Sequence, residues 1–301
     1  TGTSADYQHV QCVIDSLPDD LTEHQRKQAV ELIKEYSDQF SKSEFDIGRT
    51  TVMTHHIDTG NHKPFRQPLR RHPIQQLPII DAHVEEMLKH GIIKPAVSEW
   101  AQNVVLIRKA DQTWRFAVDM RQLNDLTVKD SYTLPRIDTC LDALSGSVFF
   151  SSCDLRQAYW QVKLDEESAP KTCFLTRKGS WQFEVLAYGM VNAPACFERL
   201  MDRVLNGLTW QACLVYLDDV LVYAPTFEEH IKRLRAVLER FREANLKLKP
   251  SKCRFFQRKV KFLGNIVSAD GILPDPEKVR AVQEWPVPNN LTAVRAFVAL
   301  A

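Results

Sequence analysis

Asp218 and Asp219 interrupt an apolar run that extends from Leu214 to Tyr223. Two short apolar segments on either side of adjacent acids predict a β-hairpin with both carboxylates at its bend. Aspartate is common in turns, so a structural role is one interpretation. Metal binding is the other, because burying adjacent negative charges is costly unless a cation neutralises them. This segment alone leaves the two interpretations equally good.

A third acid, Asp154, follows a second predicted strand at 148–153. Three carboxylates can therefore meet at the ends of neighbouring strands, and oxygen ligands of this kind suit Mg²⁺. Two such ions about 4 Å apart support phosphoryl transfer by activating an attacking hydroxyl and holding the leaving group. The sequence predicts Asp154 and Asp218 as bridging ligands and as catalytic residues, with Asp219 as a weaker third ligand.

The elements that must position these acids alternate irregularly between strand and helix. A hairpin is predicted from residues 103–108 and 114–118, and helices from residues 194–205 and 227–244. Pro194 suits a first helical turn, and Thr226 with Glu229 suits a helix start. The order lacks the regular β-α-β rhythm of a doubly wound sheet, so we expect an α+β fold.

The N-terminal third contains fewer strand signals. Residues 1–50 are expected to form a leader or linker with one helix, which begins at the capping box of Thr22 and Gln25. Prolines and arginines from Lys63 to Pro78 predict an extended basic connection. A short helix should follow and end before Gly91. Its predicted apolar face is Ile80, Val84, Met87 and Leu88.

Composition fits an ordinary globular protein, with 44% hydrophobic and 26% charged residues. No apolar run approaches the ~20 residues of a membrane helix, and no signal-peptide pattern precedes the first helix. We therefore expect a soluble intracellular protein with no membrane partner. The seven cysteines are scattered without a C-x-x-C pair, which favours reduced thiols over disulfides or a zinc site.

Positive charge is concentrated in one segment although the net charge is only +1. Residues 228–261 contain twelve Lys or Arg against four Glu. This segment could face the phosphates of a nucleic acid, or it could simply solvate the outer face of a helix. The sequence favours neither interpretation.

Four segments together resemble, in order and spacing, the successive motifs of reverse transcriptases. They are D-L-R-Q-A-Y-W-Q from Asp154, Y-G-M-V-N-A-P-A-C-F from Tyr188, Y-L-D-D from Tyr216 and F-L-G from Phe262. The likeness is closest to gypsy-type long-terminal-repeat retrotransposons (Metaviridae) and covers roughly Phe45 to the end. It implies a right-hand polymerase fold with fingers, a palm built on a mainly antiparallel sheet, and a partial thumb.

The resemblance also implies boundaries and partners. Residues 51–265 would form the fingers and palm, and residues 266–301 the start of a thumb that is truncated here. The activity would be that of an RNA-directed DNA polymerase with two Mg²⁺ ions, for which Mn²⁺ can substitute. Its partners would be an RNA or DNA template with primer, deoxynucleoside triphosphates, and the ribonuclease H and integrase domains of a Pol polyprotein. The expected location is cytoplasmic, in virus-like particles.

By the same resemblance, several residues would contact the incoming nucleotide. Tyr159 would lie beneath the sugar and exclude a 2′-hydroxyl, and Tyr188 with Gly189 would lie near the new base pair. Cations of the predicted 103–118 hairpin would contact the triphosphate, a role that suits guanidinium and ammonium groups. These cations are Arg115 and Arg108 or Lys109.

Two further roles are implied downstream of the acids. Phe262, Leu263 and Gly264 look like the primer grip, which positions the 3′ end. Lys249 is similar in position to a residue that donates a proton to the leaving pyrophosphate. Lys247 and Lys252 are equally plausible donors.

Some positions depart from the family pattern. Ala158 stands where glycine is typical, Ala187 and Tyr188 replace a Pro-Phe pair, and Ala110 and Gln112 disturb a Lys-Asp-Gly turn. Alanine replaces glycine at little cost where φ is negative and at a higher cost where φ must be positive. A catalytically decayed relic that only binds nucleic acid is therefore one alternative. An RNA-dependent RNA polymerase, which would need no aromatic sugar gate, is another.

Overall fold

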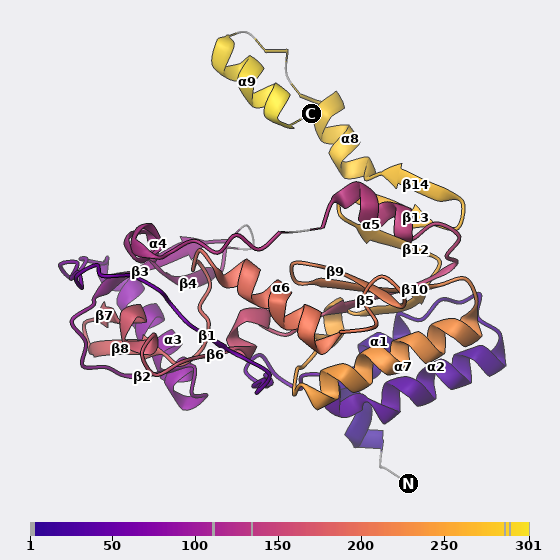
Figure 1. Cartoon of the computed structure of the whole chain (residues 1–301), viewed down its shortest axis with the longest axis horizontal. Coiled ribbons are helices and arrows are strands. Elements are labelled where there is room, and N and C mark those ends of the chain that lie inside the picture. The colour runs from indigo at the N-terminus through magenta and orange to yellow at the C-terminus, as the bar shows by residue number, and fades with distance from the viewer. Residues whose placement is uncertain (1–3, 110–111, 134, 286, 289, 301) are drawn as a thin grey trace.

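A four-stranded antiparallel sheet forms the centre of the molecule in this computed structural model, which describes residues 4–109, 112–133, 135–285, 287–288 and 290–300 (Figure 1). The strand order is β11-β5-β10-β9. The bounds are β5 Phe149–Asp154, β9 Cys213–Tyr216, β10 Asp219–Ala224 and β11 Arg254–Gln257. Helix α7 (Phe227–Glu243) packs against β5 and β10, and α6 (Ala193–Val204) packs against β9.

A second, mixed sheet of five strands lies to one side of the first, on the left in Figure 1. Its order is β2-β8-β7-β3-β4, and the β3–β7 pair is parallel. The strands are β2 Ile93–Pro95, β3 Gln102–Arg108, β4 Trp114–Val118, β7 Phe174–Thr176 and β8 Gly179–Phe183. Helix α3 (Leu77–Lys89) packs against β2 and β4. The predicted 103–118 hairpin is confirmed, since β3 pairs with β4 from Val104 with Val118 to Arg108 with Trp114.

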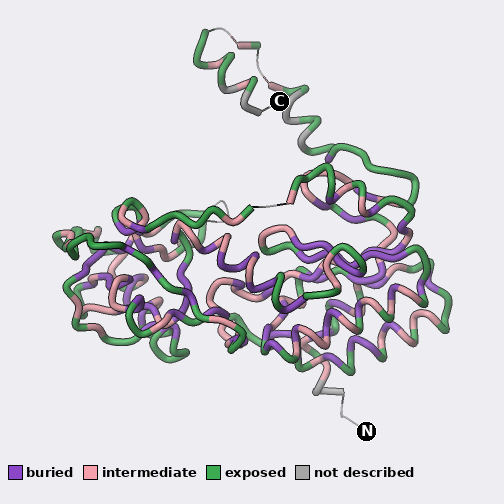
Figure 2. The backbone as a smooth tube through the Cα atoms, in the orientation of Figure 1, coloured by how far each residue is buried: buried purple, intermediate pink, exposed green. Residues whose placement is uncertain are grey.

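A third, antiparallel sheet of β12, β13 and β14 contacts β5 through β12. Beyond it, α8 and α9 extend away from the rest of the body, and exposed residues dominate them (Figures 1 and 2). The bounds are β12 Lys259–Phe262, β13 Asn265–Ser268, β14 Gly271–Pro274, α8 Pro276–Gln283 and α9 Leu291–Leu300. The remaining elements are α1 Gln11–Asp15, α2 Glu23–Glu35, α4 Arg121–Leu126, α5 Ile137–Ala143 and the parallel pair β1 Thr54–His55 and β6 Lys163–Leu164.

The helix starts follow the local sequence signals. Thr22 and Gln25 form the predicted capping box at α2, with both hydrogen bonds at 3.2 Å. The Thr226 hydroxyl accepts a hydrogen bond from the Glu229 N–H at the start of α7. The order of helices and strands confirms the α+β class.

Two expectations in the 63–90 segment are wrong in part. The extended connection ends at Pro73, because a 3-10 turn at Ile74–Gln76 leads into α3 with Pro78 in its first turn. A first-turn proline fits because the missing N–H has no intrahelical partner there. Leu88 is 38% exposed although Ile80 and Val84 are buried, so the apolar face of α3 ends before its last turn.

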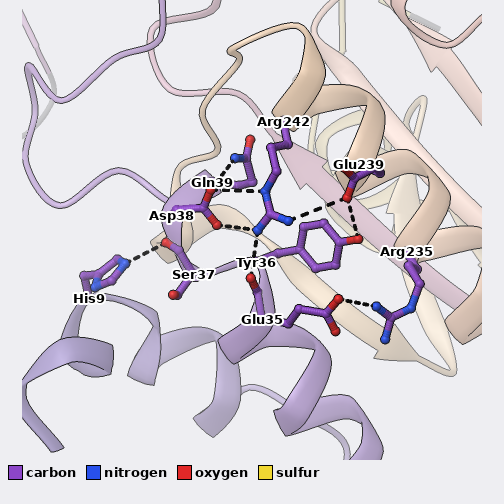
Figure 3. Close-up of polar contacts among 9 residues, drawn as sticks. All are labelled: His9, Glu35, Tyr36, Ser37, Asp38, Gln39, Arg235, Glu239 and Arg242. Carbon is purple, nitrogen blue, oxygen red and sulfur yellow. Dashed lines mark hydrogen bonds and ion pairs between the residues drawn. The ribbon is translucent and has the colours of Figure 1, made fainter. Parts of the chain in front are cut away.

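The N-terminal segment expected to form a leader packs against α7. Tyr36 and Phe40 are buried, and the Tyr36 hydroxyl donates a 2.8 Å hydrogen bond to Glu239 on α7 (Figure 3). Arg235 pairs with Glu35, and the Arg242 guanidinium lies 4.2 Å from the centre of the Tyr36 ring.

This packing explains much of the basic segment at 228–261. Arg242 also pairs with Asp38, Arg258 with Asp20 at 2.8 Å and Lys247 with Asp46 at 2.5 Å. These cations therefore face acids of the leader. For them, the interpretation of a paired and solvated helix face fits better than a face presented to phosphates.

The state of the cysteines and the length of the helices complete the description of the fold. All seven cysteines lie in the described residues and are free, and Cys12 alone among them is exposed. Across the described residues, every helix is too short or too polar to cross a bilayer.

Candidate active site

The predicted acidic hairpin is formed by β9 and β10, which are joined by the two-residue turn Leu217-Asp218. Asp219 pairs with Tyr216 across the hairpin and with Asp154 on the other side. Residues directly opposite each other in antiparallel strands have Cβ atoms about 4.5–5.5 Å apart, and like charges there repel. The register therefore places two carboxylates side by side, with Asp218 at the adjoining turn.

A side chain of α6 hydrogen-bonds to the backbone of the Leu217-Asp218 turn. Leu217 takes a left-handed conformation, with φ of +56°. Its N–H donates a 2.5 Å hydrogen bond to the Oε1 atom of Glu198 on α6. Glu198 is only 2% exposed, so this bond is shielded from water.

Burial and neighbouring charges shift the pKa values of the acids. Burial raises the pKa of Asp154, and the charge of Asp218 raises it further, while Lys252 and Lys249 oppose the shift. Burial also raises the pKa of Asp219, with added repulsion from Asp218 and Asp154. Lys252 Nζ lies 3.4 Å from Asp154 Oδ2, so one cation already approaches this cluster.

The carboxylate oxygens of Asp154, Asp218 and Asp219 are suitable ligands for divalent metal ions. Among the described residues, no three His, Cys, Asp or Glu side chains already stand close enough to enclose one ion. The carboxylates of Asp154 and Asp219 nevertheless face each other across paired strands, with Asp218 in the adjoining turn. Hard cations with oxygen ligands, such as Mg²⁺, would offset the repulsion between these acids.

Tyr159 and Tyr188 pack against each other near the acids. Their ring centroids are 5.1 Å apart, and the Tyr159 ring packs edge-on against buried Phe197 at 5.9 Å. Tyr188 is 44% exposed, and its hydroxyl donates to the Gln157 side chain at 3.0 Å. Burial and then the charge of Asp218 raise the pKa of both phenols. The structure thus brings both tyrosines into the electrostatic neighbourhood of the acids.

Gly189 needs its glycine backbone, because its φ is +91°. Its carbonyl accepts a 2.8 Å hydrogen bond from Asn124, whose side-chain oxygen accepts from the Val191 N–H. Asn124 therefore fixes the bend that follows Tyr188.

The three predicted phosphate-binding cations lie on the β3–β4 hairpin and are exposed. Arg115 lies opposite Ile107, and its charge lowers the pKa of Tyr188 against the main effect of burial. Arg108 packs over the Trp114 ring at 5.8 Å, and Lys109 begins the connecting turn. Of these three cations, Arg115 lies near enough for its charge to act on the Tyr188 phenol.

The predicted primer-grip residues lie at the end of β12 and in the two-residue turn that follows it. Leu263 and Gly264, which form the turn, both have positive φ, +50° and +75°. Phe262, the last residue of β12, is buried and lines a pocket together with Asp154, Asp219 and Lys252. The pocket therefore adjoins both the end of β12 and two of the acids.

The three candidate proton donors differ in their surroundings. Lys247 is engaged by Asp46. The Lys249 N–H donates to the carbonyl of Asp154 at 2.8 Å, and the Lys252 ammonium faces the Asp154 carboxylate. Lys249 and Lys252 therefore adjoin the cluster.

The departures from the family pattern carry different costs. Ala158 and Ala187 are buried and have no positive φ, so alanine fits there. Gln112 has φ of +67°, a conformation that favours glycine and costs another residue roughly 1–2 kcal/mol. Ala110 lies outside the described residues.

Sequence reasoning missed Glu198. The signal was present, since the acid falls among the apolar positions Phe197, Leu200 and Met201 of an amphipathic helix. Nothing local identified its partner, which lies 19 residues away at Leu217.

Comparison with known proteins gives a consistent result. Residues 107–267 match the family described as reverse transcriptase (RNA-dependent DNA polymerase). The chain is 34% identical over 258 residues to the retrovirus-related Pol polyprotein from transposon 297 of Drosophila melanogaster, covering 83% of this chain and 24% of that protein. It is 33% identical over 268 residues to the corresponding polyprotein from transposon gypsy of the same organism, covering 87% and 26%. The chain therefore spans about a quarter of the length of these relatives.

Solved structures are similar in fold. The foamy viral protease-reverse transcriptase dRH in complex with double-stranded DNA matches with a TM-score of 0.87 and 22% identity, over 97% of this chain and 51% of that chain. The foamy viral protease-reverse transcriptase in complex with an RNA/DNA hybrid matches with a TM-score of 0.85 and 22% identity, over 97% and 39%. These matches confirm the right-hand polymerase fold.

Proposed function

Because the chain belongs to the reverse transcriptase (RNA-dependent DNA polymerase) family, we propose that it adds deoxynucleotides to a primer 3′-hydroxyl under the direction of a template. The observation that carries this proposal is the cross-strand pairing of Asp154 with Asp219, beside Asp218 in the turn. A module that only bound nucleic acid would gain nothing from clustering negative charge near phosphates.

Asp154 and Asp218 would hold two Mg²⁺ ions, with Asp219 as the weaker ligand and Mn²⁺ as a substitute metal. When bound, such ions activate the attacking hydroxyl and stabilise the leaving pyrophosphate. Lys252 and Lys249 adjoin Asp154 and would offer positive charge or a proton to the leaving group. Of the two, Lys252 has its ammonium already directed at Asp154.

The tyrosines and Arg115 would shape the nucleotide site. Tyr159 is rigid because Phe197 packs against its ring, so it would resist displacement by a ribose 2′-hydroxyl. Tyr188 and Gly189 would lie near the new base pair. Arg115, with Arg108 or Lys109, would contact the triphosphate by charge-assisted hydrogen bonds.

We also propose a wider setting for this chain, on the basis of its similarity to the Pol polyproteins. We place the fingers and palm in residues 51–265, with the thumb beginning after residue 265 and Phe262, Leu263 and Gly264 as the primer grip. Substrates would be an RNA or DNA template with primer and deoxynucleoside triphosphates. Ribonuclease H and integrase would be further domains of the same polyprotein, acting in cytoplasmic virus-like particles.

Primer extension on poly(rA) with an oligo(dT) primer, dTTP and Mg²⁺ tests the proposal. The Asp218→Asn variant should lose at least about 10³-fold in rate, because a metal ligand contributes several kcal/mol of transition-state stabilisation. The matched control is Asp270→Asn, which removes an exposed acid in the β13–β14 turn and should extend primers like the parent.

The rival reading predicts a different pattern. If the parent chain binds primer–template duplex in a filter assay but incorporates no dTTP with Mg²⁺ or Mn²⁺, the protein is a binding relic and the polymerase proposal fails.

A further inference from the structure

Glu198 is deeply buried and makes a specific hydrogen bond to the backbone. It lies on α6 among apolar neighbours, yet its Oε1 atom accepts the Leu217 N–H at 2.5 Å. A carboxylate 2% exposed is uncommon unless it satisfies a specific partner, since removing the charge from water is costly. The hydrogen bond to Leu217, and not apolar packing alone, therefore accounts for an acid at this buried position.

The partner of Glu198 is the residue of the acidic turn with a positive φ. Leu217 has the positive φ that side chains other than glycine rarely adopt, and it directly precedes Asp218. Backbone conformations of this kind persist where surrounding contacts over-determine them. The hydrogen bond to Glu198 is such a contact, and it originates in a different element from the hairpin.

Helix α6 also supports the neighbouring tyrosine. Phe197 packs against the Tyr159 ring, and the next residue, Glu198, holds the Leu217 amide. One turn of helix thus fixes the sugar-side aromatic and the metal-side acids relative to each other.

We propose that Glu198 is a positioning residue that holds the Leu217-Asp218 turn, and through it the catalytic carboxylates, in the geometry needed for metal binding and catalysis. This inference rests on the proposed polymerase function. Glu198 acts through the backbone of Leu217, to which it is hydrogen-bonded.

Two replacements separate the hydrogen bond from side-chain volume. Glu198→Gln keeps an oxygen at the position of Oε1, so it should extend primers within about three-fold of the parent. Glu198→Met has similar volume but no comparable acceptor, so the turn loses its hydrogen bond to α6 and kcat should fall by about ten-fold or more. The KM for dTTP should change little, while the Mg²⁺ concentration for half-maximal activity should rise.

Leu200→Ala is the control for general damage to α6. Leu200 is fully buried on the same helix, so this variant creates a cavity and lowers stability while keeping the Glu198 acceptor. Its kcat per folded molecule should match the parent. If Leu200→Ala and Glu198→Met lose kcat equally, Glu198 has only a structural role and the proposal is overturned.

Amide hydrogen exchange at Leu217 decides the matter without any activity. Exchange should accelerate by at least about ten-fold in Glu198→Met and remain near the parent rate in Glu198→Gln. Unchanged exchange in Glu198→Met would overturn the proposal, even if the parent chain were active. If the parent extends no primer, the polymerase proposal fails, and the exchange rates still decide the role of Glu198.

Discussion

Two β-hairpins near the acid cluster turn in the same number of residues but are held in different ways. The acidic hairpin turns at Leu217-Asp218 and the β12–β13 hairpin at Leu263-Gly264, each with a leucine at positive φ. In the second turn Gly264 also takes positive φ, which costs glycine little. In the first turn Asp218 has no positive φ. Each turn therefore has one residue, its leucine, in a conformation unfavourable for its type.

The supports differ as well. A buried carboxylate from α6 holds the acidic turn, whereas the Gly264 carbonyl accepts a 3.2 Å hydrogen bond from the Asp275 N–H at the end of β14. The Asn265 side chain also donates a 3.2 Å hydrogen bond to the Leu263 carbonyl. The first turn is therefore held by a side chain from a separate helix, and the second by residues of, or next to, its own sheet. We infer that substitutions in a distant element threaten the first turn most, and changes within the hairpin the second.

The largest expected effect concerns the strand beneath the acidic hairpin. His230 on α7 lies 2.6 Å from the hydroxyl of Ser151 in β5, the strand that ends in Asp154. Burial, with a smaller contribution from Arg233, lowers the pKa of His230 to about 3. The unfolded chain therefore binds a proton below pH 6.5 that the folded chain does not. The free energy of unfolding should fall between pH 6.5 and about 3, by up to about 1.4 kcal/mol per pH unit from this group.

Urea denaturation at several pH values measures this effect. His230→Gln should flatten the pH dependence, leaving a contribution from His55, whose pKa burial lowers to about 4. His62→Gln changes an exposed histidine and should keep the parent slope. An unchanged slope in His230→Gln would mean that His230 does not stay neutral beside β5.

A backbone change at the second turn should have a medium effect. Gly264→Ala places a Cβ at φ of +75° and should reduce the free energy of unfolding by about 1–2 kcal/mol. Gly207→Ala, at φ of +81° with no atom within 4 Å of the added Cβ, should cost a similar amount. Only Gly264→Ala should slow primer extension, by several-fold. Equal extension by both variants would argue that the second turn does not position the primer.

The smallest effect should come from relieving each leucine with asparagine, which tolerates positive φ. Leu263 packs against the buried cluster around Phe150 and Phe262, so Leu263→Asn should lose burial and be net destabilising. Leu217 lies outside both buried clusters of the described residues, so Leu217→Asn should raise the free energy of unfolding by about 0.5 kcal/mol. Thermal unfolding of the two variants compares them, and the same sign in both would contradict this distinction.

Local signals in the sequence were sufficient for the hairpins and helix starts. The Thr22 capping box and the 103–118 hairpin depend on neighbours a few residues away, so they could be predicted. The acids were recognised by type and order, but the pairing of Asp154 with Asp219 depends on strands 65 residues apart. No local pattern encodes that register.

The same reasoning explains what was missed. Glu198 reads as an acid on a helix until its partner at Leu217 is known. The basic segment reads as an exposed surface until Arg235 and Arg242 are seen against Glu35 and Asp38, about 200 residues earlier. Charges that are neutralised across such separations cannot be distinguished by sequence from charges that await phosphates.

The packing of Tyr36 between Arg235 and Arg242 has an evolutionary consequence (Figure 3). Related mobile elements can recombine, and a crossover just after residue 40 would join a foreign leader to this α7. Such a chimera would bury or expose mismatched charges unless the incoming segment also supplied acids and an aromatic ring at matching positions. The leader and α7 should therefore be inherited as one unit, although two hundred residues of chain separate them.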